Sequence, residues 1–298
     1  MAARQHPVLD TPPLAQWGLG LAEPLLIAGP CRAESEDQIM TTARALAKDG
    51  RARIFRAGLW KPRTRPGQFE GAGNAGLNWL RRVKEETGLL TATEVATPQH
   101  AEACLNAGID VLWIGARTTP NPFSVQAIAD AIQGVDIPVL VKNPINPDLQ
   151  LWIGALERLH RSGIMKLAAV HRGFSWFERT PYRNSPMWEF PIRLKAAHPG
   201  LALLCDPSHI SGVTDGIGSV AQRALDLGFD GLMVEVHHDP GVARSDADQQ
   251  LTPEAYHTLL EQLIFRTAAP TADMHDQLEE LRDLIDQLDE EIAQKLGS

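Results

Sequence analysis

The chain has 298 residues, of which 44% are hydrophobic and 22% charged, and its formal net charge is −9. This composition is that of a globular protein and excludes disordered, collagen-like and membrane-spanning classes. No apolar run reaches the roughly 18 residues that a membrane span needs, and the N-terminus lacks the apolar stretch of a secretory signal. The acidic balance argues against general nucleic-acid binding, and three scattered cysteines favour the reducing cytoplasm. We therefore expect a cytoplasmic protein with no nucleic-acid or membrane partner.

Residues 1–23 are expected to form an N-terminal extension, either a short hairpin or an arm. Apolar runs then alternate with amphipathic stretches up to residue 265. The runs are near-continuous in hydrophobicity, as in parallel strands covered on both faces. Strands are predicted over residues 25–31, 53–58, 89–95, 111–116, 138–143, 165–173, 201–208 and 231–238. Helices are predicted over residues 37–48, 75–86, 98–107, 124–132, 149–161, 187–197, 220–227 and 253–263.

Eight such repeats over residues 24–265 predict an α/β protein with a (β/α)8 TIM barrel. A doubly wound open sheet is the alternative. It is less favoured because no Gly-rich dinucleotide loop follows the first strand.

The chain changes character after the barrel. Residues 266–273 are small, polar and Pro-containing, which predicts a linker. Residues 274–298 then predict a C-terminal amphipathic helix, because apolar side chains recur at spacings of three and four. The apolar positions are Leu278, Leu281, Ile285, Leu288 and Ile292. This stripe must pack on the barrel, on a second copy or on another domain, and a coiled coil is a further possibility.

Cations cluster early in the barrel. Residues 51–65 contain six cations and no acid: Arg51, Arg53, Arg56, Lys61, Arg63 and Arg65. Because residues 1–272 carry a net charge of only −2, this cluster predicts an anion site if its side chains converge.

A TIM barrel carries its chemistry at the carboxyl ends of its strands. The sequence places cations there in several repeats: Arg56, Lys61, Arg117, Lys142 and Arg172. Their mutual repulsion would destabilise the protein unless anions offset it. Guanidinium and ammonium groups bind phosphate and carboxylate oxygens. The expected ligand is therefore a phosphorylated acid or a pair of phosphorylated substrates.

A second set of polar residues lies at the ends of the first, seventh and eighth strands. It consists of Cys31, His209, Glu235 and Asp246. The first and eighth strands are neighbours in a closed barrel, so these groups could meet. Thiolate, imidazole and carboxylate groups bind divalent transition metals. Each residue alone is more often structural, and His237 and His238 are alternative ligands.

Five short motifs in chain order resemble 3-deoxy-D-arabino-heptulosonate 7-phosphate (DAHP) synthase of type I β, over roughly residues 24–265. The motifs are Gly29-Pro30-Cys31, Lys61-Pro62-Arg63-Thr64, Gly115-Ala116-Arg117, Asp206-Pro207-Ser208-His209 and Glu235-Val236-His237. The resemblance implies a transferase of the shikimate pathway, which leads to chorismate and the aromatic amino acids. Such an enzyme condenses phosphoenolpyruvate with erythrose 4-phosphate. The chain departs from the family pattern at Arg65, where Ser is common, and at Asn143-Pro144, where the nearest relatives have Arg-Gly.

The resemblance also implies roles for individual residues. One divalent ion (Mn, Fe, Co, Zn or Cd) would be held by Cys31, His209, Glu235 and Asp246. Phosphoenolpyruvate would be held by Arg56, Lys61, Arg117, Lys142 and Arg172, with Asp206 in the substrate site. Arg63 and Thr64 would meet the phosphate of erythrose 4-phosphate. Lys61 would protonate the new alkoxide, and Glu94 or a metal-bound group would orient or deprotonate the attacking water.

The tail resembles a second family. Residues 281–289 (LRDLIDQLD) look like the first helix of an all-helical chorismate mutase. This implies a shortened fusion without mutase activity. The resembled fusions use the mutase domain for allosteric regulation, so we expect the shortened form to be active but poorly inhibited by prephenate or chorismate, and we expect a homodimer or homotetramer. Two other functions stay open for the barrel. One is 3-deoxy-D-manno-octulosonate 8-phosphate (KDO 8-phosphate) synthase, and the other is a non-catalytic sensor of phosphorylated metabolites.

Overall fold

The computed structural model describes residues 8–60, 67 and 69–265. The chain divides into two compact units, Met1–Ile264 and Phe265–Ser298. The predicted linker and the predicted C-terminal helix lie outside the described residues, so the fold described below is that of the first unit.

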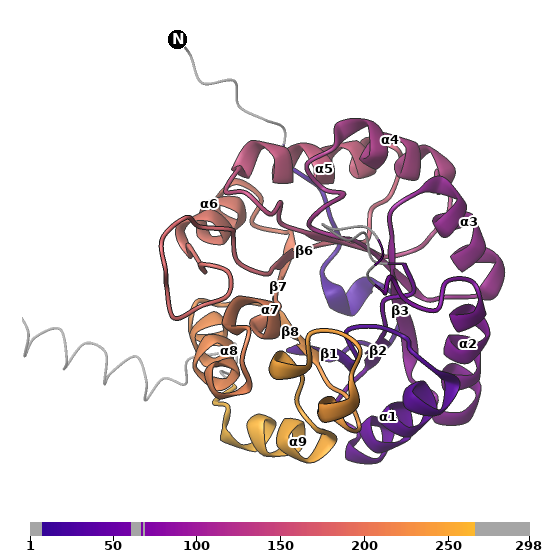
Figure 1. Ribbon diagram of the computed structural model, residues 1–298. Helices are drawn as coiled ribbons and strands as arrows, with labels where there is room; N and C mark the ends of the chain where they lie inside the picture. Colours follow the sequence, from indigo (N-terminus) through magenta and orange to yellow (C-terminus); the bar gives the residue numbers. More distant parts are fainter. Residues whose placement is uncertain (1–7, 61–66, 68, 266–298) are drawn as a thin grey trace, which may run out of the picture. The chain divides into compact units, whose positions relative to one another are not determined.

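Eight parallel strands close into a barrel, and each strand pairs with the next along the chain (Figure 1). The strands are β1 (Leu25–Gly29), β2 (Ile54–Arg56), β3 (Leu90–Val95), β4 (Val111–Ile114), β5 (Val139–Lys142), β6 (Leu167–His171), β7 (Ala202–Cys205) and β8 (Gly231–Glu235). The ring is closed by β1 and β8, whose register runs from Leu25 opposite Gly231 to Gly29 opposite Glu235. The predicted (β/α)8 barrel is therefore confirmed, and the open sheet is excluded.

A ring of helices surrounds the strands (Figure 1). The helices are α1 (Glu36–Asp49), α2 (Ala75–Thr87), α3 (Pro98–Ala107), α4 (Pro122–Ala131), α5 (Leu149–Arg161), α6 (Glu189–Ala197), α7 (Pro207–Ser211), α8 (Ile217–Asp226) and α9 (Pro253–Gln262). Local sequence sets their ends. The Ser35 side chain accepts a hydrogen bond from the Gln38 N–H at the start of α1, and Gly50 ends that helix at a φ of 77°. Polar N-caps and left-handed glycine C-caps are the usual helix signals.

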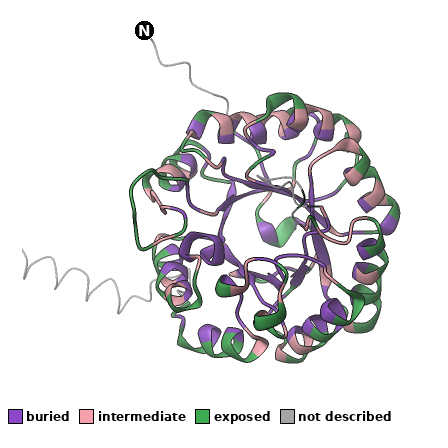
Figure 2. Cartoon of the chain, viewed as in Figure 1, coloured by how far each residue is buried: buried purple, intermediate pink, exposed green. Residues whose placement is uncertain are grey.

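The apolar core has two layers. One lies between the strands and the helices and includes Phe55 and Trp152. The other fills the barrel interior and includes Ile27, Trp113 and Met233. Figure 2 shows the buried strands and the helices with buried inner and exposed outer faces. Apolar residues are thus needed on both faces of every strand, which explains the near-continuous apolar runs.

Within the described residues 8–23, the N-terminal extension is a plug and forms no hairpin. A short 3-10 helix, η1 (Leu14–Gln16), lies within the ring of strands in the view of Figure 1. Leu14, Trp17 and Leu21 join the inner core, and Trp17 is fully buried. The indole Nε1 of Trp17 donates a hydrogen bond to the carbonyl of Pro12. Burial of these apolar side chains fixes the segment against the barrel.

The predicted seventh strand is too long. It was expected over residues 201–208, but β7 ends at Cys205 and α7 begins at Pro207. Proline has no N–H and is favoured in the first turn of a helix, and the Asp206 side chain caps that turn by accepting from the His209 N–H. His209 is therefore placed on a short helix. Among the described residues, we find no helix whose length and apolarity would let it cross a membrane.

Candidate active site

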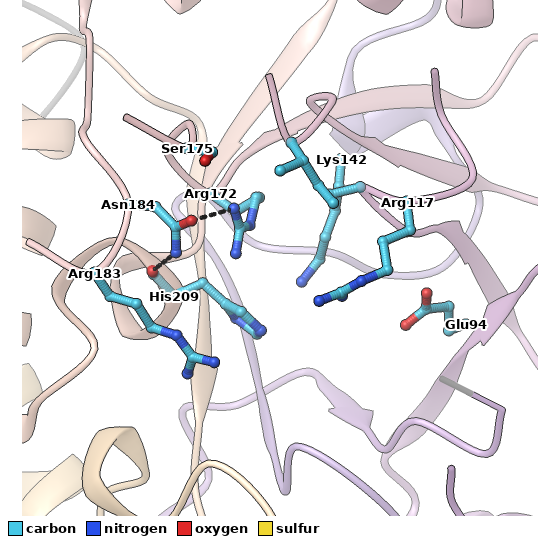
Figure 3. A pocket seen from close by; sticks show the side chains of 11 residues that line it. Glu94, Arg117, Lys142, Arg172, Ser175, Arg183, Asn184 and His209 are labelled. Atoms are coloured by element: carbon cyan, nitrogen blue, oxygen red, sulfur yellow. Dashed lines mark hydrogen bonds between the residues drawn. The ribbon is translucent and has the colours of Figure 1, made fainter. Parts of the chain in front are cut away.

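A pocket of about 200 Å³ opens at the carboxyl ends of the strands (Figure 3). Four cations and one acid line it, so its charge is strongly positive. The lining residues are Glu94, Gly115, Ala116, Arg117, Lys142, Ile145, Arg172, Ser175, Arg183, Asn184 and His209. Such a cationic pocket suits a ligand with phosphate or carboxylate groups.

Lys142 is the last residue of β5 and lies in the wall of the pocket. Its ammonium Nζ is 2.6 Å from Oδ2 of Asp206, which is fully buried. Burial lowers the pKa of Lys142, while the charge of Asp206 opposes that change. Burial alone would raise the pKa of Asp206, but the neighbouring His209 and Lys142 hold it well below its ordinary value. Asp206 thus stays ionised behind the pocket wall, where it holds Lys142 and caps α7.

Arg172 follows β6 and is positioned by two asparagines, one of which, Asn184, is seen beside it in Figure 3. Its backbone N–H donates to Oδ1 of Asn143 at 2.7 Å, and its Nη1 donates to Oδ1 of Asn184 at 2.7 Å. Asn184 in turn donates to the carbonyl of His209 at 2.6 Å. Burial lowers the pKa of Arg172 to about 10, so the guanidinium is charged at neutral pH. Asn143, which departs from the family pattern after the fifth strand, therefore positions this arginine.

Arg117 and Glu94 lie on the opposite side of the pocket. Figure 3 shows the Arg117 guanidinium between Lys142 and Glu94. Glu94, on β3, is almost fully buried, with 7% of its surface exposed. A Cβ atom at Gly115 would lie 1.9 Å from Oε1 of Glu94. Glycine is therefore required in the Gly115-Ala116-Arg117 motif, because it leaves room for this carboxylate.

Arg56 is buried at the end of β2. Its Nη1 donates to Oε1 of Glu235 at 3.0 Å, its Nη2 donates to the carbonyl of Cys31 at 3.2 Å, and its Cζ lies 4.8 Å from the centre of the Trp113 ring. Burial opposes its charge and is the largest single effect, but Glu235, Cys31, Asp206 and Glu94 together outweigh it and raise the pKa of Arg56. Arg56 does not line the pocket and instead joins Trp113 of the inner core to two of the predicted metal ligands, Cys31 and Glu235.

The four predicted metal ligands meet in two pairs. The Sγ atom of Cys31 is 3.0 Å from Oδ2 of Asp246. Nδ1 of His209 is 3.7 Å from Oε1 of Glu235. Burial lowers the pKa of His209 to about 4, although Asp206 and Glu235 oppose the shift, so its imidazole is neutral at pH 7. A neutral imidazole is the form that binds metals.

Hydrogen bonds join the two pairs to one another. Arg183 Nη1 donates to Oδ1 of Asp246 at 2.8 Å and to Oε1 of Gln249 at 2.5 Å, and Gln249 Nε2 donates to Oε2 of Glu235 at 2.6 Å. Within residues 8–60, 67 and 69–265, no group of three or more His, Cys, Asp or Glu side chains is arranged to hold a metal ion. A thiol, a neutral imidazole and two carboxylates nevertheless fit a divalent transition metal by chemical type.

The alternative ligands take other contacts. The rings of His237 and His238 stack at 4.7 Å between centres. Nδ1 of His237 accepts from the Asp239 N–H, and Nδ1 of His238 lies 3.5 Å from Oγ1 of Thr42 on α1. These contacts direct the two rings toward the loop after β8 and toward α1.

Among the described members of the early cationic cluster, Arg51 and Arg53 do not converge with Arg56. Arg51 pairs with Asp49 at 2.7 Å, and Arg53 donates to the carbonyl of Gly20. Both precede β2 and so lie at the amino end of that strand, whereas Arg56 lies at its carboxyl end. Lys61, Arg63, Thr64 and Arg65 lie outside the described residues.

Three residues of the site were missed by the sequence interpretation: Arg183, Asn184 and Gln249. They lie in the segment between β6 and α6 and in the loop after β8, where no periodic pattern exists. Only the approach of the folded loops to the strand ends brings Arg183 and Asn184 to the pocket and Gln249 to Glu235.

The chain is similar to proteins of known class over most of its length. Residues 16–268 match the model of the DAHP synthetase I family. The chain belongs to this family. A curated relative, phospho-2-dehydro-3-deoxyheptonate aldolase of Thermotoga maritima, is 32% identical over 242 residues, which cover 80% of this chain and 68% of the relative.

Two further similarities extend the comparison. The crystal structure of the DAHP synthase from Thermotoga maritima superimposes on this chain with a TM-score of 0.72 and 28% identity. The match covers 88% of this chain and 70% of the Thermotoga chain. A 2-dehydro-3-deoxyphosphooctonate aldolase of Nitratidesulfovibrio vulgaris is 28% identical over 276 residues, which cover 87% of this chain and 96% of that relative. The family match and the Thermotoga relative confirm the predicted membership of the DAHP synthase type I family and the predicted enzyme class, a 3-deoxy-7-phosphoheptulonate synthase.

Proposed function

We propose that this chain condenses phosphoenolpyruvate with erythrose 4-phosphate and water to give DAHP and inorganic phosphate. The observation that carries the proposal is the cationic pocket of Arg117, Lys142, Arg172 and Arg183 at the strand ends of a chain from this family. Two anionic substrates repel each other, and these cations offset that repulsion when both are bound.

The described residues suggest how phosphoenolpyruvate is held. Arg117, Lys142 and Arg172 enter the pocket from the ends of three successive strands. They would bind its phosphate and carboxylate and present C3 to the aldehyde carbon of the sugar. When C3 forms the new bond, C2 gains positive charge, and water adds there. Glu94, across the pocket, would orient or deprotonate that water. The resulting hemiketal phosphate collapses with C–O cleavage and releases phosphate.

The metal set is part of the proposal. Cys31, His209, Glu235 and Asp246 would hold one divalent ion (Mn, Fe, Co, Zn or Cd), and their thiol, imidazole and carboxylate donors support this role. When bound, the ion supplies Lewis-acid polarisation of the aldehyde oxygen. Arg56 and Asp206 would act beside these ligands by holding Glu235 and Lys142.

Lys61, Arg63 and Thr64 complete the proposed site from the segment after β2. By motif, Lys61 protonates the alkoxide, and Arg63 and Thr64 bind the phosphate of erythrose 4-phosphate. These roles remain proposals, because the three residues lie outside the described part of the chain.

A steady-state assay with metal-depleted protein tests the proposal. Phosphate release should appear only when phosphoenolpyruvate, erythrose 4-phosphate and a divalent ion are all added. Cys31→Ala should abolish this metal-dependent turnover, whereas Cys104→Ala, a buried cysteine on α3, should retain it. Full activity of Cys31→Ala in metal-free buffer would contradict the metal assignment.

KDO 8-phosphate synthase is the second candidate, because the Nitratidesulfovibrio relative aligns over 87% of this chain. The Lys-Pro-Arg-Thr motif and the higher identity of the Thermotoga enzyme favour DAHP synthesis. Parallel assays with erythrose 4-phosphate and arabinose 5-phosphate decide between them. A non-catalytic sensor would bind phosphoenolpyruvate and turn over neither sugar phosphate.

The remaining assignments concern the setting of the enzyme. No disulfide joins the three cysteines, which supports the reducing cytoplasm. A homodimer or homotetramer, and regulation through the mutase-like tail, are proposed from the sequence. Light scattering and prephenate inhibition, measured with and without residues 274–298, test both.

A further inference from the structure

We propose that Arg183 and Gln249 are positioning residues that orient the two carboxylates of the metal set. The inference rests on the proposed function, because it takes Cys31, His209, Glu235 and Asp246 as the ligands. It adds two residues outside that set and outside the five sequence motifs.

The two residues form one continuous chain of hydrogen bonds. Arg183 Nη1 donates to Oδ1 of Asp246 at 2.8 Å and to Oε1 of Gln249 at 2.5 Å. Gln249 Nε2 donates to Oε2 of Glu235 at 2.6 Å. Carboxylates from β8 and from the loop that follows it are thus tied to the segment between β6 and α6.

This chain engages one oxygen of each carboxylate and leaves the other turned toward the remaining two donors. Oδ2 of Asp246 lies 3.0 Å from Sγ of Cys31. Oε1 of Glu235 lies 3.7 Å from Nδ1 of His209 and also accepts from Arg56 Nη1 at 3.0 Å. Arg183 and Gln249 therefore hold both carboxylates from the side away from the thiol and the imidazole, and Arg56 holds Glu235 from the other side as well. Such outer contacts commonly set the affinity of a metal site.

Side-chain chemistry explains why glutamine suits position 249. A guanidinium only donates and a carboxylate only accepts, so a link between them needs one acceptor and one donor. The glutamine amide provides both, and Gln249 is fully buried beside the fully buried Glu235. A leucine of similar size would remove both hydrogen bonds.

The backbone of Asp246 supports a built site. Its φ is +51°, and among the described residues only Met187 shares a positive φ without being glycine. A left-handed conformation at a non-glycine residue persists where surrounding contacts hold it. The 3-10 turn η4 (Ala247–Gln249) begins at the next residue, so this conformation also places Gln249 within hydrogen-bond distance of Glu235.

A competing effect has the opposite sign. The positive charge of Arg183 would repel a metal ion, so its removal would strengthen metal binding. The Arg183 side chain is 48% exposed, and solvent and salt therefore screen its charge. Gln249 is uncharged, so replacing it changes orientation without changing charge. The two residues together separate the two effects.

Cadmium titration of the metal-depleted protein tests the inference. The ultraviolet thiolate-to-cadmium charge-transfer band reports binding at Cys31 independently of turnover. We expect Gln249→Leu and Arg183→Lys each to weaken cadmium binding by about 10-fold. The double variant should lose about as much as either single variant, because both act through one chain of hydrogen bonds. Arg193→Gln, an exposed arginine on α6, is the control and should bind as the parent does.

Each other outcome overturns a stated part of the inference. Unchanged or stronger cadmium binding in both single variants overturns the orienting role. The charge-transfer band of the parent protein would in that case still support the proposed metal ligands. Absence of the band in the parent, or its persistence in Cys31→Ala, overturns the metal set and this inference together. Thermal unfolding of each variant shows that it is folded, and Arg183→Lys, a half-exposed position, keeps the test decisive if Gln249→Leu does not fold.

Discussion

Buried charged side chains in the pocket wall and next to it are stabilised by partners at hydrogen-bond distance. Arg56 and Glu235 are 3% and 0% exposed, and their charged atoms are 3.0 Å apart. Lys142 and Asp206 form a second buried pair. Removing a charge from water is costly, and only a close partner in good geometry offsets that cost. These pairs therefore tie the stability of the barrel to the same residues that we propose for function.

Removing one member of the Arg56–Glu235 pair should destabilise the protein strongly. We expect Arg56→Met to lower the free energy of unfolding by about 3–5 kcal/mol, because Glu235 would remain buried without this partner. The exposed pair Arg44–Glu86 gives the control, and Arg44→Met should cost less than about 1 kcal/mol. Urea denaturation measures both, and the added change Glu235→Gln should recover part of the loss. Equal effects of Arg56→Met and Arg44→Met would show that burial of the pair is unimportant.

His171 on β6 should make the stability depend on pH. Its fully buried ring lies among Trp152, Phe174, Trp188 and Phe229. Burial lowers its pKa from 6.5 to about 3. As the pH falls through 6.5 the unfolded chain therefore takes up the proton first, and stability is lost between about pH 6.5 and pH 3.

At pH 5 this effect of His171 amounts to about 2 kcal/mol. The variant His171→Phe keeps a ring of similar shape and removes the titrating group. Between pH 7 and pH 5 it should lose about 2 kcal/mol less unfolding free energy than the parent, because the other histidines act equally in both proteins. Urea denaturation at the two pH values measures the difference. Equal losses of unfolding free energy in the parent and the variant would mean that the pKa of His171 is the same in the folded and the unfolded chain.

At the scale of elements, periodicity predicted the barrel because each strand and helix carries its own local signal. Signals failed where two elements meet without a loop. The apolar run of β7 passes directly into α7, and only Pro207 and the Asp206 cap mark the change. The loops that complete the site carry no period at all. Arg183 and Gln249 are brought to the strand ends by tertiary packing, which no spacing along the chain reveals.

The segment between β6 and α6 is held close to its strand by Gly173. The φ of this residue is +74°, and a Cβ atom there would lie 2.7 Å from the carbonyl oxygen of Asn184. Gly173→Ala should therefore displace Asn184 and misalign Arg172, to which it is hydrogen-bonded. We expect the KM for phosphoenolpyruvate to rise by at least about 10-fold, since a hydrogen bond to a charged group contributes about 1.5–3 kcal/mol.

Gly228→Ala is the matched control for Gly173. Its φ is +76°, and nothing lies within 4 Å of the added carbon. Both variants should lose about 1–2 kcal/mol of stability from left-handed strain at an L-residue. Only Gly173→Ala should change the KM in steady-state assays. A similar KM in the two variants would show that the contact with Asn184 does not position Arg172.

At the scale of the barrel unit, the two ends of the strands have different tasks. The pocket and the charged network lie at the carboxyl ends, whereas the N-terminal plug of Leu14, Trp17 and Leu21 packs into the inner core. This division is general in TIM barrels, where function resides at one face and stability at the other. Sequence motifs identified the functional end because its chemistry requires particular residue types. The motifs did not predict the plug, because packing into the inner core requires only apolar side chains.

Truncation of the plug should therefore reduce stability without changing substrate affinity. Trp17 is fully buried, so Trp17→Ala should lower the free energy of unfolding by about 3–5 kcal/mol through lost burial and a residual cavity. The KM for phosphoenolpyruvate, measured at a temperature where the variant is folded, should match the parent. Ile192→Ala, an exposed position on α6, should change stability by no more than about 0.5 kcal/mol. A raised KM in Trp17→Ala would instead show that the inner core transmits the loss of the plug along the strands to Lys142 and Arg172.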